Sequence, residues 1–310
     1  MWTVFAFISA LCLGCYDVSK KIALRNLPVL SVLTLSIVFS AIILAVPLCL
    51  STYFPELMSG TPFFVPELDG EAHLYTLLKS VIVLSSWVFA YISLKHLPIS
   101  VVSPMQATRP MWTLIGALLL FDERLNGWQW AGVVLAIGSI FVFSFRERRE
   151  VRRDSEDKWY YICLALAILI GACSGLYDKY LMRRYDHNAV QVWYTFYQAA
   201  MMLMTFAVIN AIDKRKGEEG QWSRLRSVPI RTILPVLLIS VFLVISDNVY
   251  MLALRDPDSM IAVVSTIRRG GAVIGFAYGL LFLHEANPWR KVLCMIGICA
   301  GLICLAIGAA

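Results

Sequence analysis

The chain has 310 residues, a formal net charge of +6 at pH 7 and a mean hydropathy of +0.71. Apolar residues make up 59% of it, whereas a soluble domain is about 45–50% apolar. This composition excludes an ordinary soluble domain and predicts an all-α integral membrane protein. The eight cysteines lie in apolar runs without metal-ligand spacing, and no nucleic-acid-binding motif is present. We therefore expect no metal site, no cofactor and no nucleic-acid partner.

Ten apolar runs approach the roughly 20 residues that a helix needs to cross a bilayer. In chain order they are residues 2–24, 31–51, 74–93, 99–121, 128–145, 159–182, 189–212, 232–254, 259–283 and 292–309. The first run has no basic residue before it and carries Lys20 and Lys21 near its end, the reverse of a signal peptide. We therefore predict ten transmembrane helices.

The fourth and ninth runs, LKHLPISVVSPMQATRPMWTLIGALLLFDER and LRDPDSMIAVVSTIRRGGAVIGFAYGLLFLHE, share one pattern. The matching pairs are Pro98 and Pro257, Ser100 and Ser259, Arg109 and Arg268, and Glu123 and Glu285. The first and sixth runs share Gly-x-Tyr-Asp, which ends at Asp17 and at Asp178. The repeating unit is therefore five helices, and because five is odd the second copy must enter the membrane from the opposite side.

Two inverted five-helix repeats are the predicted architecture, with a first repeat at residues 1–145, a charged linker at 146–158 and a second repeat at 159–310. The linker and the 213–231 loop are rich in Lys and Arg and are predicted to share one side of the membrane. The positive-inside rule makes that side cytoplasmic and leaves both termini outside. The short loops favour a multi-pass protein of a bacterial inner membrane.

A polar or small stripe recurs along the fourth run at Gln106, Arg109, Thr113 and Gly116. An arginine at the centre of a membrane helix costs about 2.5–3.5 kcal/mol, so it needs acceptors inside the helix bundle or in a wet cavity. The functional interpretation is that Arg109 and Arg268 flank a substrate path and bind a carboxylate or phosphate through forked hydrogen bonds. The alternative is a structural ion pair with an aspartate; we expect Arg269 to point elsewhere on its helix.

Three carboxylates lie within the apolar runs. Asp17 and Asp178 could carry a coupling ion, but Lys20 stands three residues from Asp17 and a simple neutral pair is the alternative. Asp247 has no oppositely charged neighbour on its own helix, so we expect it to bind substrate or to pair with an arginine.

Aromatic residues complete the predicted substrate site: Trp87, Tyr194 and Tyr250. Gln191, Tyr194 and Gln198 share one helical face, which we expect to point inward. The spaced pairs Gly171 and Gly175, and Gly297 and Gly301, are interpreted as close helix packing. The turn that contains Glu123 is expected to anchor a helix end and not to be catalytic.

The repeat LPISVVSPMQATRPMWTLIGALLLFDERLNGWQWAGVVLAIGSI and its weaker copy DPDSMIAVVSTIRRGGAVIGFAYGLLFLHEANPWRKVLCMIGICAGLI resemble the ten-helix EamA-like permeases of the drug/metabolite transporter superfamily. The resemblance implies a central cavity with, in this chain, Asp17, Trp87, Arg109, Asp178, Asp247 and Arg268. It also implies gradient-driven transport or exchange without nucleotide hydrolysis. Family members usually keep both termini in the cytoplasm, which departs from the loop charges here.

The leading hypothesis is a secondary-active transporter, permease or exporter, of a small polar or amphoteric metabolite such as an amino acid, working by alternating access around a midplane cavity. Its expected partners are that substrate, the lipid bilayer and a coupling proton or sodium ion, and the protein is expected to be a monomer or homodimer. One alternative is a flippase of a lipid-linked head group. An intramembrane enzyme is the other, and it is disfavoured because neither HExxH nor GxSxG is present.

Overall fold

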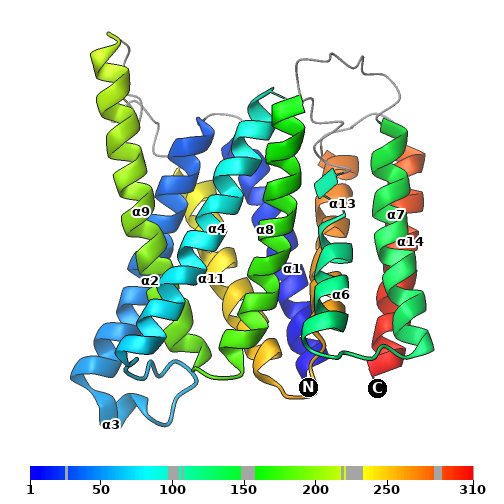
Figure 1. Ribbon diagram of the computed structural model, residues 1–310, viewed down its shortest axis with the longest axis horizontal. Helices are drawn as coiled ribbons and strands as arrows, with labels where there is room; N and C mark the ends of the chain where they lie inside the picture. The colour runs from blue at the N-terminus through cyan, green and yellow to red at the C-terminus, as the bar shows by residue number, and fades with distance from the viewer. Residues whose placement is uncertain are drawn as a thin grey trace. The chain divides into compact units, whose positions relative to one another are not determined.

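The computed structural model describes residues 1–24, 27–96, 105, 106, 108–147, 158–217, 220, 233–282 and 288–309. Within these ranges the regular structure is helical and no strand occurs. The helices are α1 (Trp2–Ala23), α2 (Val29–Tyr53), α3 (Pro55–Met58), α4 (Gly70–His96), α6 (Arg109–Leu120), α7 (Gly127–Glu147), α8 (Lys158–Met182), α9 (His187–Arg215), α11 (Ile233–Arg255), α12 (Ile261–Arg269), α13 (Ala272–Phe282) and α14 (Pro288–Ala309) (Figure 1). The all-α prediction is confirmed for this part of the chain.

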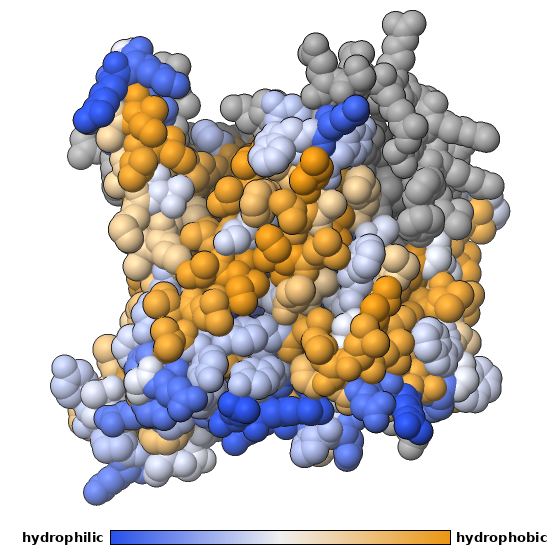
Figure 2. All heavy atoms as spheres, viewed as in Figure 1, coloured by the Kyte–Doolittle hydropathy of each residue, from blue (hydrophilic) through white to orange (hydrophobic). Residues whose placement is uncertain are grey.

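Six helices in the described ranges, α1, α2, α4, α8, α9 and α11, are long and apolar enough to cross a membrane. Large apolar side chains point outward from several of them, among them Ile42 on α2 and Met204 on α9, which are 58% and 65% exposed. On the face drawn in Figure 2, hydrophobic residues cover the middle of the helices and hydrophilic residues gather at their ends. Such a surface suits a hydrocarbon environment, so the protein is a multi-pass membrane protein.

The ninth apolar run is interrupted, although its sequence predicts one helix from 259 to 283. Helix α12 ends at Arg269, two glycines follow, and α13 begins at Ala272. Glycine is about 1 kcal/mol less favourable in a helix than alanine, and two in succession weaken the helix at this point. A side chain at Gly270 would also lie 2.7 Å from Leu302. The prediction of one continuous helix is therefore wrong at Gly270–Gly271.

Unit 1 of the structure comprises residues 1–11, 81–184 and 249–310, so it draws on both predicted repeats. In it, α7 and α14 pack along each other (Figure 1). A Cβ atom at Gly301 would lie 2.7 Å from the backbone nitrogen of Ala136, and one at Gly132 would lie 2.8 Å from the carbonyl oxygen of Gly301. The predicted close approach at Gly297 and Gly301 is confirmed, because only glycine leaves room for a neighbouring helix at this distance.

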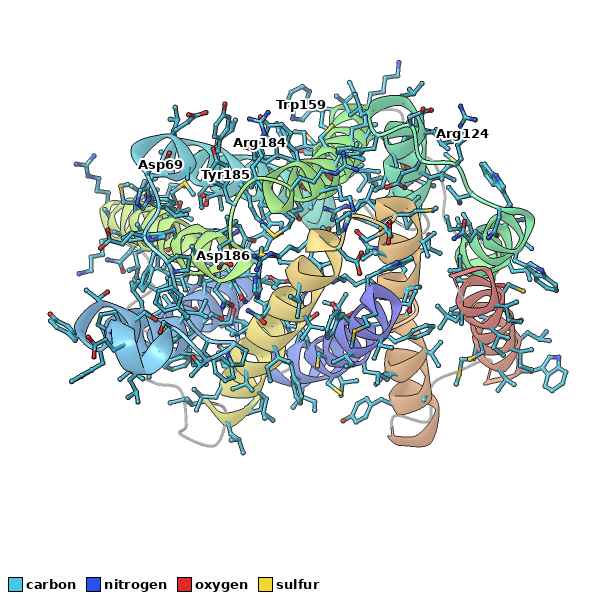
Figure 3. The ribbon with its side chains drawn as sticks, turned by 90° about the horizontal axis from the view of Figure 1, so that it is seen from below. Asp69, Arg124, Trp159, Arg184, Tyr185 and Asp186 are labelled. Carbon is cyan, nitrogen blue, oxygen red and sulfur yellow. The ribbon has the colours of Figure 1, made fainter. Side chains whose placement is uncertain are left out.

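Unit 2 comprises residues 12–80 and 185–248. Helices α2 and α9 pack together, and one of its apolar cores is formed by Leu44, Val65, Ala189 and Val192. At the helix starts labelled in Figure 3, Asp69 accepts a hydrogen bond from the N–H of Ala72 at 2.9 Å, and Asp186 caps α9. These caps satisfy backbone donors that a helix leaves unpaired at its first turn.

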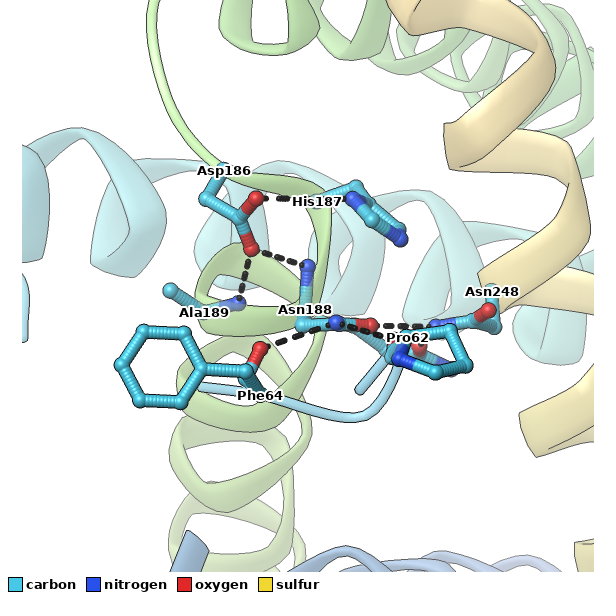
Figure 4. Close-up of polar contacts among 8 residues, drawn as sticks. Pro62, Phe64, Asp186, His187, Asn188, Ala189 and Asn248 are labelled. Carbon is cyan, nitrogen blue, oxygen red and sulfur yellow. Dashed lines mark hydrogen bonds and ion pairs between the residues drawn. The ribbon is translucent and has the colours of Figure 1, made fainter. Parts of the chain in front are cut away.

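Polar side chains fix the start of α9 (Figure 4). The Asp186 carboxylate accepts from the N–H groups of Asn188 and Ala189 at 2.9 and 3.3 Å. Burial raises the pKa of Asp186, but the hydrogen bond and charge of His187 and the two N–H groups outweigh burial, so the net pKa lies below its ordinary value. The Asn188 amide donates to the carbonyl oxygen of Phe64 at 2.9 Å, which ties the preceding loop to α9.

Candidate functional site

Arg109 is the first residue of α6 and lies against α8 inside unit 1. Its Nη2 donates a hydrogen bond to the carbonyl oxygen of Gly171 at 2.6 Å. A Cβ atom added to Gly171 would lie 2.5 Å from Cζ and 2.7 Å from Nε of Arg109. The guanidinium therefore rests directly on the backbone of α8, at a place where any side chain on residue 171 would displace it.

Arg268, near the end of α12, lies over the ring of Tyr250, with 4.1 Å between Cζ and the ring centre. Tyr250 belongs to α11 and is 5% exposed. A Cβ atom at Gly175 would lie 3.9 Å from the Tyr250 hydroxyl oxygen and 4.0 Å from Cγ2 of Thr113, which are ordinary contact distances. Helices α6, α8 and α11 thus meet at Gly175, one turn along α8 from the arginine contact.

The charged groups that act on the Arg109 guanidinium are Arg269, Asp178 and Arg268, and the Tyr250 hydroxyl acts on it as well. Asp178 is 8% exposed on α8. Arg269, the last residue of α12, also acts electrostatically on Arg109. We call Arg109, Arg268, Arg269, Asp178 and Tyr250 the arginine cluster. Its guanidinium groups offer planar N–H forks that match a carboxylate or a phosphate.

A second polar constellation lies in unit 2. It is a pocket whose empty space is about 270 Å³, including the part that opens outward. Its lining residues are Ile37, Ser40, Gln191, Tyr194, Thr195, Gln198, Leu243, Val244 and Asp247. The structure buries Gln191, Tyr194 and Gln198, as the shared helical face predicts, and it places Asp247 with them. We call this the acceptor pocket, because oxygen atoms that can accept hydrogen bonds line it.

The other residues predicted for the site lie elsewhere. Trp87 on α4 and Gln106, which precedes α6, are both partly buried in unit 1. Asp17 is exposed on α1 in unit 2, where it acts electrostatically on Lys20. Lys20 also lies over the ring of Tyr16, 5.5 Å from its centre. Asp17 therefore lies near a lysine of its own helix, and its role as an ion-coupling carboxylate or as a structural partner stays a prediction.

Lys179 is a buried cation whose surroundings the sequence does not reveal. It is 0% exposed, and its Nζ donates to the carbonyl oxygen of Ser259 at 2.6 Å and to those of Leu254 and Asp256, each at 3.4 Å. It also donates to Oγ of Ser259. The loop between α11 and α12 is therefore wrapped around this ammonium group.

Glu123 anchors the start of α12, as expected from its turn. Its carboxylate accepts from the N–H groups of Ile261 and Ala262 at 2.6 and 3.2 Å. Burial raises the pKa of Glu123 above its ordinary value, and the two backbone hydrogen bonds and the charges of Lys179 and Arg183 offset this only in part. Glu285, its counterpart in the second repeat, lies outside the described residues, as do Pro98 and Ser100.

Metal chemistry has no obvious centre in the part of the chain that the structure describes. No group of three or more His, Cys, Asp or Glu side chains there could hold a metal ion. The described cysteines are free thiols that form no disulfide. Hydrogen bonding and charge are thus the chemistry that these helices present.

Comparisons with known proteins agree with this architecture. Residues 1–145 match the model of the EamA-like transporter family. A crystal structure of a protein superimposes on the chain with a TM-score of 0.76 at 13% sequence identity, covering 99% of this chain and 96% of that one, which shows a shared fold. No curated protein matches the chain significantly. Residues 1–145, slightly less than half of the chain, are thus similar to the EamA-like transporter family, in agreement with the resemblance seen in the sequence.

Proposed function

We propose that this protein is a secondary-active transporter of a small polar or amphoteric metabolite that carries a carboxylate or phosphate group, an amino acid being one example. The match of residues 1–145 to the EamA-like transporter family supports membrane transport. The arginine cluster supports the anionic group, because guanidinium forks recognise planar oxyanions with two parallel hydrogen bonds. In this proposal Arg109 and Arg268 bind the anionic group, and Tyr250 holds Arg268 in place through the ring contact.

The observation that carries the proposal is the environment of Arg109. Among the described residues, Nη2 is its one hydrogen-bonding nitrogen, although a guanidinium has five N–H donors. An arginine within the membrane is costly, and a structural role would be expected to pair more of its donors. An anionic ligand would pair the others and would offset the charge of the three arginines.

The proposal keeps the ten-helix inverted repeat and alternating access as its framework. Figure 1 shows the start of α1 and the end of α14, both in unit 1, at the same end of that unit, as an even number of crossings requires. Arg109 is the first residue of α6 and Arg268 is the last but one of α12, so each arginine stands at a helix end. Discontinuous helices of this kind form the substrate sites of many secondary transporters.

The test is thermal unfolding of the purified full chain with a panel of amino acids, organic acids, nucleotide sugars and quaternary amines. A ligand that binds only the native state raises the melting temperature. We expect an anionic or amphoteric compound to raise the melting temperature. In Arg109→Ala, the half-saturating concentration of this compound should rise at least tenfold. Arg109→Lys should lose ligand affinity as well, because lysine keeps the positive charge but lacks the two parallel N–H donors of a guanidinium group.

The matched control is Arg184→Ala. Arg184 is an exposed arginine that also contacts an aromatic ring, that of Tyr180 at 4.4 Å. It should leave both the ligand response and uptake into proteoliposomes unchanged. If Arg109→Ala and Arg268→Ala transport as the wild type does, the arginine cluster is not the substrate site. If only lipids with charged head groups stabilise the protein, a flippase replaces the metabolite transporter.

A further inference from the structure

The acceptor pocket in unit 2 lies among α2, α9 and α11 and is separate in sequence and in composition from the arginine cluster. Its polar lining consists of one carboxylate, two amides, the Tyr194 phenol and the hydroxyls of Ser40 and Thr195. We propose that this pocket binds a single monovalent cation, either sodium or a small ammonium ion. Nothing in the family match assigns such a site.

The two aliphatic hydroxyl groups can only accept hydrogen bonds from a ligand in the pocket. Ser40 Oγ donates its proton to the carbonyl oxygen of Ser36 at 2.8 Å, and Thr195 Oγ1 donates to that of Gln191 at 2.8 Å. A hydroxyl has one proton and two lone pairs. Both oxygens therefore keep lone pairs for the pocket and have no proton to offer it.

The amide of Gln191 is arranged in the same way. Its Nε2 donates to the carbonyl oxygen of Val244 at 2.7 Å, while its Oε1 accepts from Nδ2 of Asn248 at 2.8 Å. A carbonyl oxygen accepts two hydrogen bonds, so Oε1 retains one lone pair. One donor of this amide is thus directed to the protein, and its oxygen keeps a lone pair for a ligand.

Gln198 also lines the pocket, with an amide nitrogen that lacks a partner among the described residues. It is 4% exposed, it lines the pocket, and its Nε2 has no hydrogen-bond partner. Half a turn of the amide exchanges nitrogen and oxygen, which places a carbonyl oxygen where the nitrogen lacks a partner. A buried amide atom without a partner is costly, and a cation in the pocket would favour the orientation that presents the oxygen.

Asp247 sets the charge of the ligand. It lies inside the span Ile233–Arg255 and is the one carboxylate among the lining residues of the pocket. A divalent ion such as calcium takes six to eight oxygen ligands and usually several carboxylates. One carboxylate with neutral oxygens around it suits a single positive charge. The cation site rests on these contacts alone, whereas the further step that the cation drives transport rests on the proposed function.

The experiment measures the melting temperature of the purified full chain against NaCl, KCl, ammonium chloride and methylammonium chloride, with choline chloride keeping the ionic strength constant. We expect sodium or an ammonium ion to raise the melting temperature by several degrees with a saturable dose response. In Thr195→Val and Asp247→Asn the half-saturating concentration should rise at least tenfold. The ion that stabilises the protein at the lowest concentration shows whether the pocket prefers sodium or an ammonium ion.

Thr205→Val is the matched control. Thr205 is also on α9 and donates to a carbonyl oxygen one turn earlier, that of Met201 at 2.9 Å, but it does not line the pocket. It should respond to the ion as the wild type does. The proposal is overturned if no ion exceeds choline, or if Thr195→Val and Thr205→Val respond alike. Neither result would bear on the Arg109 test, so the two proposals fail separately.

Discussion

Two cations of unit 1, Lys179 and Arg109, differ in how the helices surround them. Lys179 has no exposed surface, and its three N–H donors are shared among four acceptors, which are three carbonyl oxygens and the Ser259 hydroxyl. Arg109 is partly exposed and pairs one of its nitrogens, in the described part of the chain, with Gly171. A cation enclosed by protein acceptors holds a loop in place, whereas one with remaining donors can bind a ligand.

The largest effect should come from exchanging each cation for methionine. Lys179→Met leaves the carbonyl groups around it without a donor, and hydrogen bonds from a charged group contribute about 1.5–3 kcal/mol each, so unfolding should become easier by about 3 kcal/mol or more. Arg109→Met removes a charge that is costly in the membrane and should leave stability unchanged or higher, while the ligand response disappears. Denaturant unfolding of both variants measures this difference. Equal losses of stability would remove the distinction between the two cations.

A smaller effect is expected from a pair of glycines on α8. Gly171→Ala puts a methyl group 2.5 Å from Cζ of Arg109, and the long arginine side chain can move away. The protein should therefore stay folded, but ligand affinity should fall about tenfold, which corresponds to about 1.4 kcal/mol. Gly175→Ala meets its nearest neighbour at 3.9 Å and should bind ligand normally. Ligand titrations followed by melting temperature compare the two, and a loss in Gly175→Ala alone would contradict the placement of Arg109.

The smallest effect concerns Glu123, next to the Lys179 loop. Because the folded pKa of Glu123 is raised, the folded state prefers the protonated acid. The contribution of this carboxyl group to the free energy of unfolding is therefore full below its ordinary pKa of 4.5. It is lost as the pH rises through the folded pKa. Glu123→Gln resembles the protonated acid, so its stability relative to the wild type should increase over that interval and then level off. Glu123→Ala also loses the helix cap, about 1 kcal/mol at low pH. Melting curves from pH 4 to 8 test this, and a difference that falls with pH would show the opposite sign.

The membrane helices and the arginines follow from the sequence, because hydropathy and a charge in an apolar run are local properties. Arg109 and Arg268 stand out in this way, and Gln191 and Gln198 share a face that periodicity reveals. The turn at Glu123 was correctly predicted as an anchor. These features need no knowledge of which helices meet.

What the sequence did not reveal are contacts between segments that lie far apart along the chain. The spacing of Gly171 and Gly175 predicts helix packing, but Gly171 accommodates a guanidinium from α6. Lys179 lies next to Asp178 in the sequence, whereas its hydrogen bonds go to residues 254–259. The two glycines at 270 and 271 were a local signal for a helix break. The prediction of one helix rested instead on the length of the apolar run.

The contact between α7 and α14 has a consequence for how the protein is made. The backbone approach at Gly132 and Gly301 requires both helices, yet α8, α9, α11, α12 and α13 are synthesised between them. At about 5–20 residues per second, translation of the intervening segment takes on the order of ten seconds. During that interval the glycine face of α7 has no α14 to pack against. The rate of translation, and not the rate at which the two helices pack, therefore limits how soon this part of unit 1 can form.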